Sequence, residues 1–168
     1  MDIIFKRRSI RRYTNQEISE AMTEKIIRAG MAAPSAHNEQ PWQFIVLKDK
    51  SLLSDITKFH PYSGMLPEAN CAIVVCSDLS NEKIKKFWIQ DCSAATQNML
   101  LMATELGLGS VWLGVYPNDD IVTQMKELLN LPEHIIPFSI VSLGYPAETK
   151  EPIDRFDKTK VHMNKWQQ

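Results

Sequence analysis

The run Cys71-Ala72-Ile73-Val74-Val75-Cys76 decides the fold, because six apolar residues follow one another without a polar break. Such a run is typical of a β-strand whose two faces are both buried. A strand of this kind needs helices above and below its sheet. The chain of 168 residues is long enough to supply them around one hydrophobic core. We therefore expect residues 1–168 to form a single domain.

The segments around this run alternate between helices and strands, which indicates an α/β or α+β protein with helices covering a sheet. Ser19 is the predicted N-cap of a helix that ends at Pro34. Residues 60–70 contain two prolines and a glycine and should be irregular. The buried face of the capped helix should consist of Met22, Ile26, Ile27 and Met31. Further helices are predicted near 2–7, 51–58, 87–106 and 118–129, and further strands at 42–47, 110–113 and 137–143.

The composition excludes several classes of protein. With 19 basic and 20 acidic side chains the net charge is −1, which argues against a nucleic-acid-binding protein with a broad basic surface. The N-terminus has no signal-peptide pattern and no apolar run could span a bilayer, so we expect a cytoplasmic protein without a membrane partner. Three cysteines without CxxC spacing fit buried, reduced thiols, and four scattered histidines predict no metal site.

The segment Arg7-Arg8-Ser9-Ile10-Arg11-Arg12 concentrates four guanidinium groups and a hydroxyl in six residues. Guanidinium groups match phosphate oxygens with paired hydrogen bonds. The segment therefore indicates a local anion site. A solvated basic turn is an equally good interpretation of these residues alone.

Two glycine-rich or polar segments are further candidates for binding. The loop from Pro34 to Trp42 carries small and amide side chains that can hydrogen-bond a heterocycle, although an ordinary helix-to-strand connection explains it too. The stretch from Gly107 to Gly114 is no dinucleotide fingerprint, because Trp112 occupies the third glycine position and a strand follows a helix here. Its glycines can let the backbone approach a flat ring.

The tail from residue 149 to 168 is charged but carries Phe156, Val161, Met163 and Trp166. These isolated apolar side chains cannot form a core of their own. We expect the tail either to be disordered or to dock on a partner subunit.

Taken in order, several segments resemble the nitroreductase family of FMN enzymes. They are Arg7-Arg8-Ser9-Ile10-Arg11, the Pro-Ser-x-x-Asn-x-Gln-Pro-Trp-x-Phe segment from Pro34 to Phe44, the helix residues Asp91 to Leu100, the Gly-x-Gly-Ser-x-Trp-Leu-Gly stretch ending at Gly114, Gly144-Tyr145-Pro146, and Asp154-Arg155-Phe156. The resemblance covers nearly the whole chain. It implies an α+β fold with a mainly antiparallel central sheet flanked by helices, assembled as an intertwined homodimer with shared FMN sites.

The resemblance also assigns residues to the FMN site. Arg7, Arg8, Ser9 and Arg11 match positions that contact the phosphate, the ribityl chain and the ring edge. Pro34, Ser35, Ala36 and Asn38 match the segment that reaches the flavin from the partner chain. Leu113 and Gly114 match the backbone beside flavin N5, with the Leu113 N–H as its donor, and Arg155 matches a late basic residue on the phosphate.

The implied activity is an NAD(P)H oxidoreductase that passes two electrons through flavin N5 to a nitroaromatic, quinone or similar acceptor by a ping-pong mechanism. No side chain is then needed as a catalytic acid or base. The alternatives are other FMN chemistry on this fold, such as reductive dehalogenation or flavin conversion with residues 60–70 as a lid, and a non-catalytic flavin-binding or sensory protein. An anion-binding or nucleic-acid module would use the arginine cluster alone.

Overall fold

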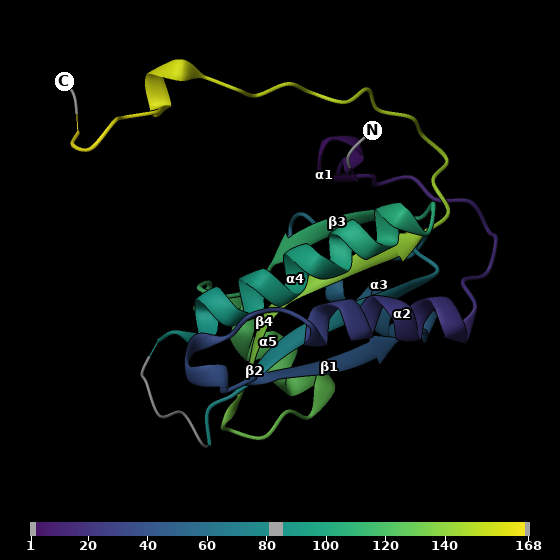
Figure 1. Ribbon diagram of the computed structural model, residues 1–168. Coiled ribbons are helices and arrows are strands. Elements are labelled where there is room, and N and C mark those ends of the chain that lie inside the picture. The colour runs from purple at the N-terminus through teal and green to yellow at the C-terminus, as the bar shows by residue number, and fades with distance from the viewer. Residues whose placement is uncertain (1–2, 81–85, 167–168) are drawn as a thin grey trace.

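A four-stranded antiparallel sheet in the order β1-β2-β4-β3 forms the centre of the computed structural model, which describes residues 3–80 and 86–166 (Figure 1). This arrangement confirms the predicted α+β class. The expected helix at 2–7 is α1, Ile3–Lys6, and Asp2 lies outside the described residues. The strands are β1 (Trp42–Leu47), β2 (Cys71–Asp78), β3 (Gly109–Gly114) and β4 (Ile135–Gly144).

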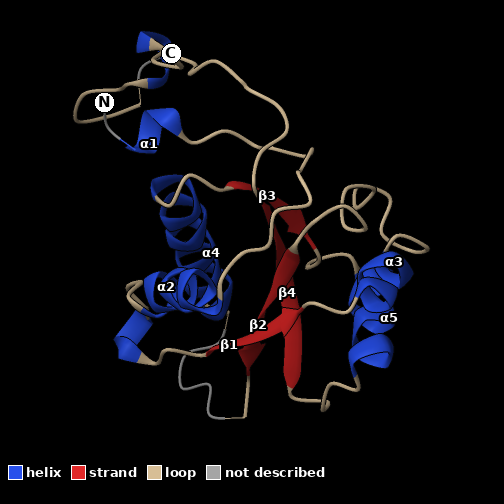
Figure 2. Cartoon of the chain, turned by 90° about the vertical axis from the view of Figure 1, so that its right-hand side faces the viewer, coloured by secondary structure: helices blue, strands red, loops and turns tan. Residues whose placement is uncertain are grey.

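Strand β2 is buried on both faces, as its apolar run predicts. Helices α2 (Glu20–Met31) and α4 (Trp88–Glu105) cover one face of the sheet, and α3 (Lys50–Ile56) and α5 (Asp119–Leu129) cover the other (Figure 2). Alternate residues of β2 serve the two layers: Val74 packs in the cluster of α3 and α5, whereas Ile73 and Val75 pack in that of α2 and α4. Among the described residues no helix is long and apolar enough to cross a membrane.

Helix α2 begins where the sequence predicts, but its buried face is rotated. The Ser19 side chain accepts a hydrogen bond from the Met22 N–H and caps the helix. Ile26 is buried, but Met31 is 53% exposed, so the prediction that Met31 faces the core is wrong. Gly30 takes its place, because a Cβ there would lie 3.0 Å from Met99 of α4. The two helices therefore meet at a residue without a side chain.

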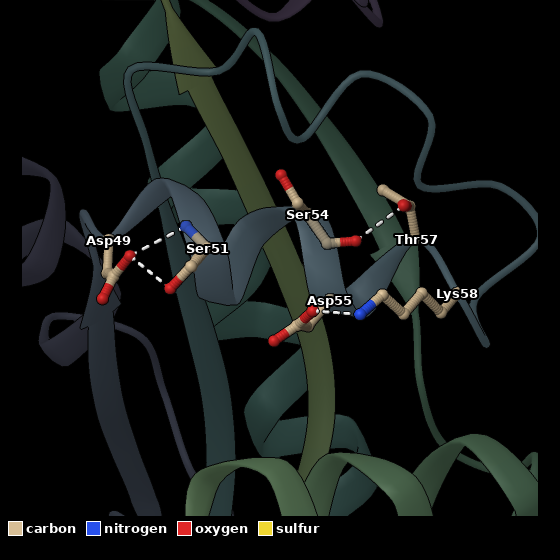
Figure 3. A network of polar contacts seen from close by, with 6 residues as sticks. All are labelled: Asp49, Ser51, Ser54, Asp55, Thr57 and Lys58. Carbon is tan, nitrogen blue, oxygen red and sulfur yellow. Dashed lines mark hydrogen bonds and ion pairs between the residues drawn. The ribbon is translucent and has the colours of Figure 1, made fainter.

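Helix α3 is held at both ends by short-range polar contacts (Figure 3). Asp49 accepts hydrogen bonds from the N–H and hydroxyl of Ser51 at 2.8 and 2.7 Å, and these bonds lower the pKa of its carboxyl. At the other end Thr57 donates its hydroxyl to the Ser54 carbonyl at 2.7 Å. Lys58 pairs with Asp55. The fixed end of α3 leads into residues 60–70, which are irregular as predicted and consist of turns and bends.

The chain beyond β4 leaves the globular body and runs past α1 as an extended tail (Figure 1). Its apolar side chains are exposed in a single copy: Phe156 by 77%, Met163 by 69% and Trp166 by 80%. Residues 167–168 of the expected tail lie outside the described residues.

Candidate functional site

The arginine segment lies along the outer edge of β3, the edge strand of the sheet. The Ile10 N–H donates to the Ser110 carbonyl at 3.0 Å, and Ser9 pairs with Ser110 as a parallel bridge. Gly109 makes this approach possible, since a Cβ there would lie 2.6 Å from Ile10 Cγ2. The glycine at this position therefore admits Ile10, and not the flat ring that the sequence suggested for the stretch as a whole.

Tyr13 connects the same segment to the sheet through two hydrogen bonds. Its hydroxyl donates to the Ile10 carbonyl at 2.8 Å and accepts from the Ser142 hydroxyl at 3.0 Å. Burial raises the pKa of Tyr13, so its hydroxyl remains a donor. The ring lies over Gly144, where a Cβ would come within 2.6 Å of it. Gly109 and Gly144 thus leave the space that lets the arginine segment pack against the sheet.

The first residues after β4 add polar contacts to the arginine segment. Lys150 Nζ donates to the Ser9 carbonyl at 2.7 Å, and the Glu148 carboxylate accepts from the Arg11 N–H at 2.6 Å. The bond from Arg11 lowers the pKa of Glu148, so this acceptor stays charged. Both contacts hold backbone groups of the segment, and neither uses a guanidinium group.

Arg7, Arg8 and Arg155 line one pocket of about 480 Å³. Burial, followed by the charges of Arg155 and Arg8, lowers the pKa of Arg7. Asp154 shares the pocket, but its carboxylate accepts a hydrogen bond from the Phe156 N–H at 2.9 Å. Three like charges around one concavity favour a ligand with more than one negative charge.

A second pocket, of about 450 Å³, brings together Arg11, Leu113 and Gly114. His60, Tyr62 and Trp112 complete it, together with Pro61, Gly64 and Met65. Sequence reasoning missed His60 and Tyr62 as lining residues. Their partners on β3 lie more than fifty positions along the chain, so no local pattern could identify them. A Cβ on Gly114 would meet no atom within 4 Å, which leaves room for a flat group against the strand.

The backbone direction of β3 decides which donors face this pocket. Each strand residue turns its N–H and C=O to one side, and successive residues alternate. The carbonyls of Ser110 and Gly114 both point to the outer edge, because they accept from Ile10 and His60. The Gly114 N–H therefore faces outward, whereas the Leu113 N–H points to β4, opposite Ile140. The Leu113 N–H, which the resemblance assigns to the flavin, therefore faces β4 and not the pocket.

The loop with Pro34, Ser35, Ala36 and Asn38 lines neither of these two pockets. It packs instead against the first turn of α4, where Asp91 accepts a hydrogen bond from the Ala36 N–H at 2.9 Å. The second oxygen of Asp91 is buried without a partner among the described residues, and burial raises the pKa of this carboxyl. A single copy of the chain therefore does not unite the two halves of the expected site.

The other candidate chemistries receive no support from the described part of the chain. The cysteines are free and buried, and burial raises their pKa values, to about 11 for Cys71 and about 12 for Cys76 and Cys92. Such thiols are poor nucleophiles. No group of three acidic, histidine or cysteine side chains within residues 3–80 and 86–166 is arranged to hold a metal ion.

The chain is similar in sequence and in structure to known proteins. Residues 4–61 and 57–145 match the model of the nitroreductase family. A protein of Methanothermobacter thermautotrophicus named "Putative NADH dehydrogenase/NAD(P)H nitroreductase" is 49% identical over 166 residues, 99% of this chain and 87% of that protein. An FMN-dependent nitroreductase structure from Clostridium difficile has a TM-score of 0.90 at 32% identity, covering 98% of each chain. A Desulfovibrio desulfuricans structure described as "a putative nitroreductase in complex with fmn" has a TM-score of 0.84 at 30% identity, covering 98% and 96%.

Proposed function

The chain belongs to the nitroreductase family, and from this premise we propose how it acts as an FMN-dependent NAD(P)H oxidoreductase. The coarse activity follows from the family and from relatives named for NAD(P)H and FMN. The observation that carries the finer proposal is the arginine segment, which connects a pocket of three guanidinium groups to an open strand edge. A phosphate at one end and a flat heterocycle at the other suit FMN.

The described residues fit FMN at both ends. Arg7, Arg8 and Arg155 would hold the phosphate, with Ser9 beside it on the same segment. The ring would lie in the second pocket, against the space that Gly114 leaves open. The Gly114 N–H, rather than that of Leu113, is the proposed donor to flavin N5. Arg11 would face the N1–C2 edge, where its cation stabilises negative charge.

Bound in this site, FMN would supply the redox chemistry, a two-electron transfer from NAD(P)H through N5. The protein's part is to bind, orient and polarise. One pocket would hold the ring, with the strand edge against the ring edge, which supports successive use of the same ring face by the reductant and by a nitroaromatic, quinone or similar acceptor. This is the ping-pong order proposed for the enzyme. The first half of the 60–70 segment, from His60 to Met65, lines the pocket, and Leu66 and Ala69 in its second half are fully buried. That burial favours these acceptors over chemistry that requires a mobile lid.

A second copy of the chain would complete the site. Pro34, Ser35, Ala36 and Asn38 lie against α4 of their own copy and would reach the flavin of the partner. The exposed Phe156 and Trp166 of the tail would gain a surface to cover in the same homodimer. Each copy would then supply the arginine half of one site and the loop half of the other, which suits a two-fold interface.

The test is the visible spectrum of the purified protein under anaerobic conditions. Flavin absorption that bleaches with NADH or NADPH, and returns when a quinone is added, supports the proposal. A colourless protein that fails to take up FMN, or a yellow one that neither reductant bleaches, refutes it. The elution volume on size exclusion, with and without FMN, tests the homodimer.

A further inference from the structure

His60 links the start of the 60–70 segment to the last residue of β3. It is 2% exposed, and its Nε2 lies 2.8 Å from the Gly114 carbonyl oxygen. Its Nδ1 lies 3.3 Å from the Tyr62 nitrogen. One buried ring therefore contacts both the strand edge and the turn that faces it across the pocket.

The two contacts fix which nitrogen carries the proton. The Tyr62 N–H can only donate, so Nδ1 must offer its lone pair. The Gly114 carbonyl can only accept, so Nε2 must carry the hydrogen. Both contacts are satisfied by the same neutral tautomer, with no conflict at either end.

This bond fixes the peptide that follows Gly114. On one side its carbonyl oxygen accepts from His60, and on the other the Val115 N–H donates to the Phe138 carbonyl at 3.0 Å. The Gly114 N–H belongs to the preceding peptide, which the pairing of Leu113 with Ile140 holds in the ladder. Gly114 is therefore restrained on both sides, by the ladder before it and by His60 after it, and together these set the direction of its N–H. The pocket thus has a rigid donor at its strand edge.

The segment that carries His60 is itself anchored. The Ser63 hydroxyl donates to the His60 carbonyl at 2.7 Å, and the Leu66 N–H donates to the Ser63 carbonyl at 2.9 Å. Lys50 of α3 donates to the Ala69 carbonyl. His60 therefore acts from a fixed support, and its ring cannot follow Gly114 if the strand end shifts.

We propose that His60 is a positioning residue, which aims the Gly114 N–H at flavin N5 through the Gly114 carbonyl. The inference rests on the proposed function of the pocket. Oxidised N5 accepts a hydrogen bond, whereas reduced N5 carries a proton of its own. A well-aimed donor therefore favours oxidised flavin, and loosening it raises the midpoint potential.

Two substitutions separate the contacts of the ring. His60→Gln places an amide nitrogen near the position of Nε2, so it keeps donation to Gly114. His60→Asn places an oxygen near the position of Nδ1, so it keeps the Tyr62 contact and loses Gly114. We expect His60→Asn to weaken FMN binding about tenfold, the scale of one hydrogen bond. A tenfold preference for reduced over oxidised flavin raises the potential by about 30 mV for two electrons.

The experiment measures FMN dissociation constants and midpoint potentials for the wild type and both variants. The proposal requires His60→Gln to match the wild type while His60→Asn changes both quantities. Equal values for all three proteins, or a Gln variant as impaired as the Asn variant, would overturn it.

A measurement without flavin separates this inference from the proposed function. Amide hydrogen exchange at Val115 of the apoprotein, whose N–H donates to the Phe138 carbonyl, should accelerate in His60→Asn and not in His60→Gln. Unchanged exchange in both variants overturns the anchoring itself. Failure of the wild type to bind FMN refutes the proposed function, whereas normal binding with no effect of His60→Asn refutes only the positioning role.

Discussion

Replacing Arg7 by alanine should have opposite effects on the empty protein and on its complex with FMN. In the empty protein, burial and the charges of Arg155 and Arg8 disfavour the Arg7 cation, which is why its pKa is lowered. Removing that cation relieves repulsion. In the complex, the same guanidinium would bind the phosphate, and removing it loses a charge-assisted hydrogen bond.

The two magnitudes differ enough to be told apart. Loss of a hydrogen bond to a charged group costs about 1.5–3 kcal/mol, which is roughly a 10- to 150-fold weaker FMN affinity. Relief of repulsion is smaller because the Arg7 side chain is partly solvated. It should raise the free energy of unfolding of the apoprotein by no more than a few tenths of a kcal/mol.

The assay is titration of apoprotein with FMN, followed by quenching of flavin fluorescence, beside urea unfolding of the apoprotein. Arg12→Ala is the matched control, because it removes an equal charge from the same segment but lines neither pocket. Added salt should weaken FMN binding less in Arg7→Ala than in the wild type.

Two results would refute the reasoning. One is full FMN affinity in Arg7→Ala, which would show that the phosphate lies elsewhere. The other is an equal loss in Arg12→Ala, which would reduce the role of the cluster to its net charge. A marked loss of apoprotein stability in Arg7→Ala would contradict the claim that the guanidinium is held for a ligand.

Three further substitutions test the rest of the site. Arg11→Ala should lower the flavin midpoint potential, by about 30 mV for each tenfold loss of preference for reduced flavin, in equilibrium reduction with a reference dye. Gly144→Ala should lower the free energy of unfolding in urea by about 1–3 kcal/mol through overpacking, whereas Gly64→Ala, with open space around it, should stay within about 0.5 kcal/mol. Burial raises the pKa of Asp91, so its carboxylate costs stability as the pH rises above the ordinary value of 3.8. Asp91→Asn should therefore raise the free energy of unfolding by about 1 kcal/mol near pH 7, and by nothing near pH 3, in urea melts at both values.

Helices and strands whose positions depend on neighbouring residues could be predicted from the sequence. The strand at Trp42–Leu47 has the predicted bounds, and Ser19 caps α2 as expected. Both depend on neighbours within a few positions, which a single sequence shows. The face of α2 depends on another helix, and the error at Met31 arose because Gly30 lets α4 approach more closely than apolar spacing suggests.

In the candidate site, too, features set by residue type could be predicted, whereas features set by distant contacts could not. Arg7, Arg8, Arg11 and Gly114 could be predicted as site residues from their residue types, and they line the two pockets. Their contact with FMN stays a prediction. The choice between the N–H groups of Leu113 and Gly114 required the parity of β3, which is set by its contacts with Ile10 and His60. Those contacts span about a hundred and about fifty positions of the chain. No periodicity within the strand reports which of its edges is open.

The separation of the two halves of the site has a consequence for how this protein tolerates change. The loop from Pro34 to Asn38 is held by Asp91 of its own copy, while the flavin it is proposed to reach is held by the arginine segment of the other. A substitution at Asp91 would then act on a ring that its own copy does not bind. A mixed dimer of one Asp91→Ala copy and one Arg7→Ala copy would concentrate both defects in one site and leave the second intact. Such a dimer should bind one FMN at wild-type affinity, and two weakened sites, each carrying one of the substitutions, would show instead that each copy builds its own.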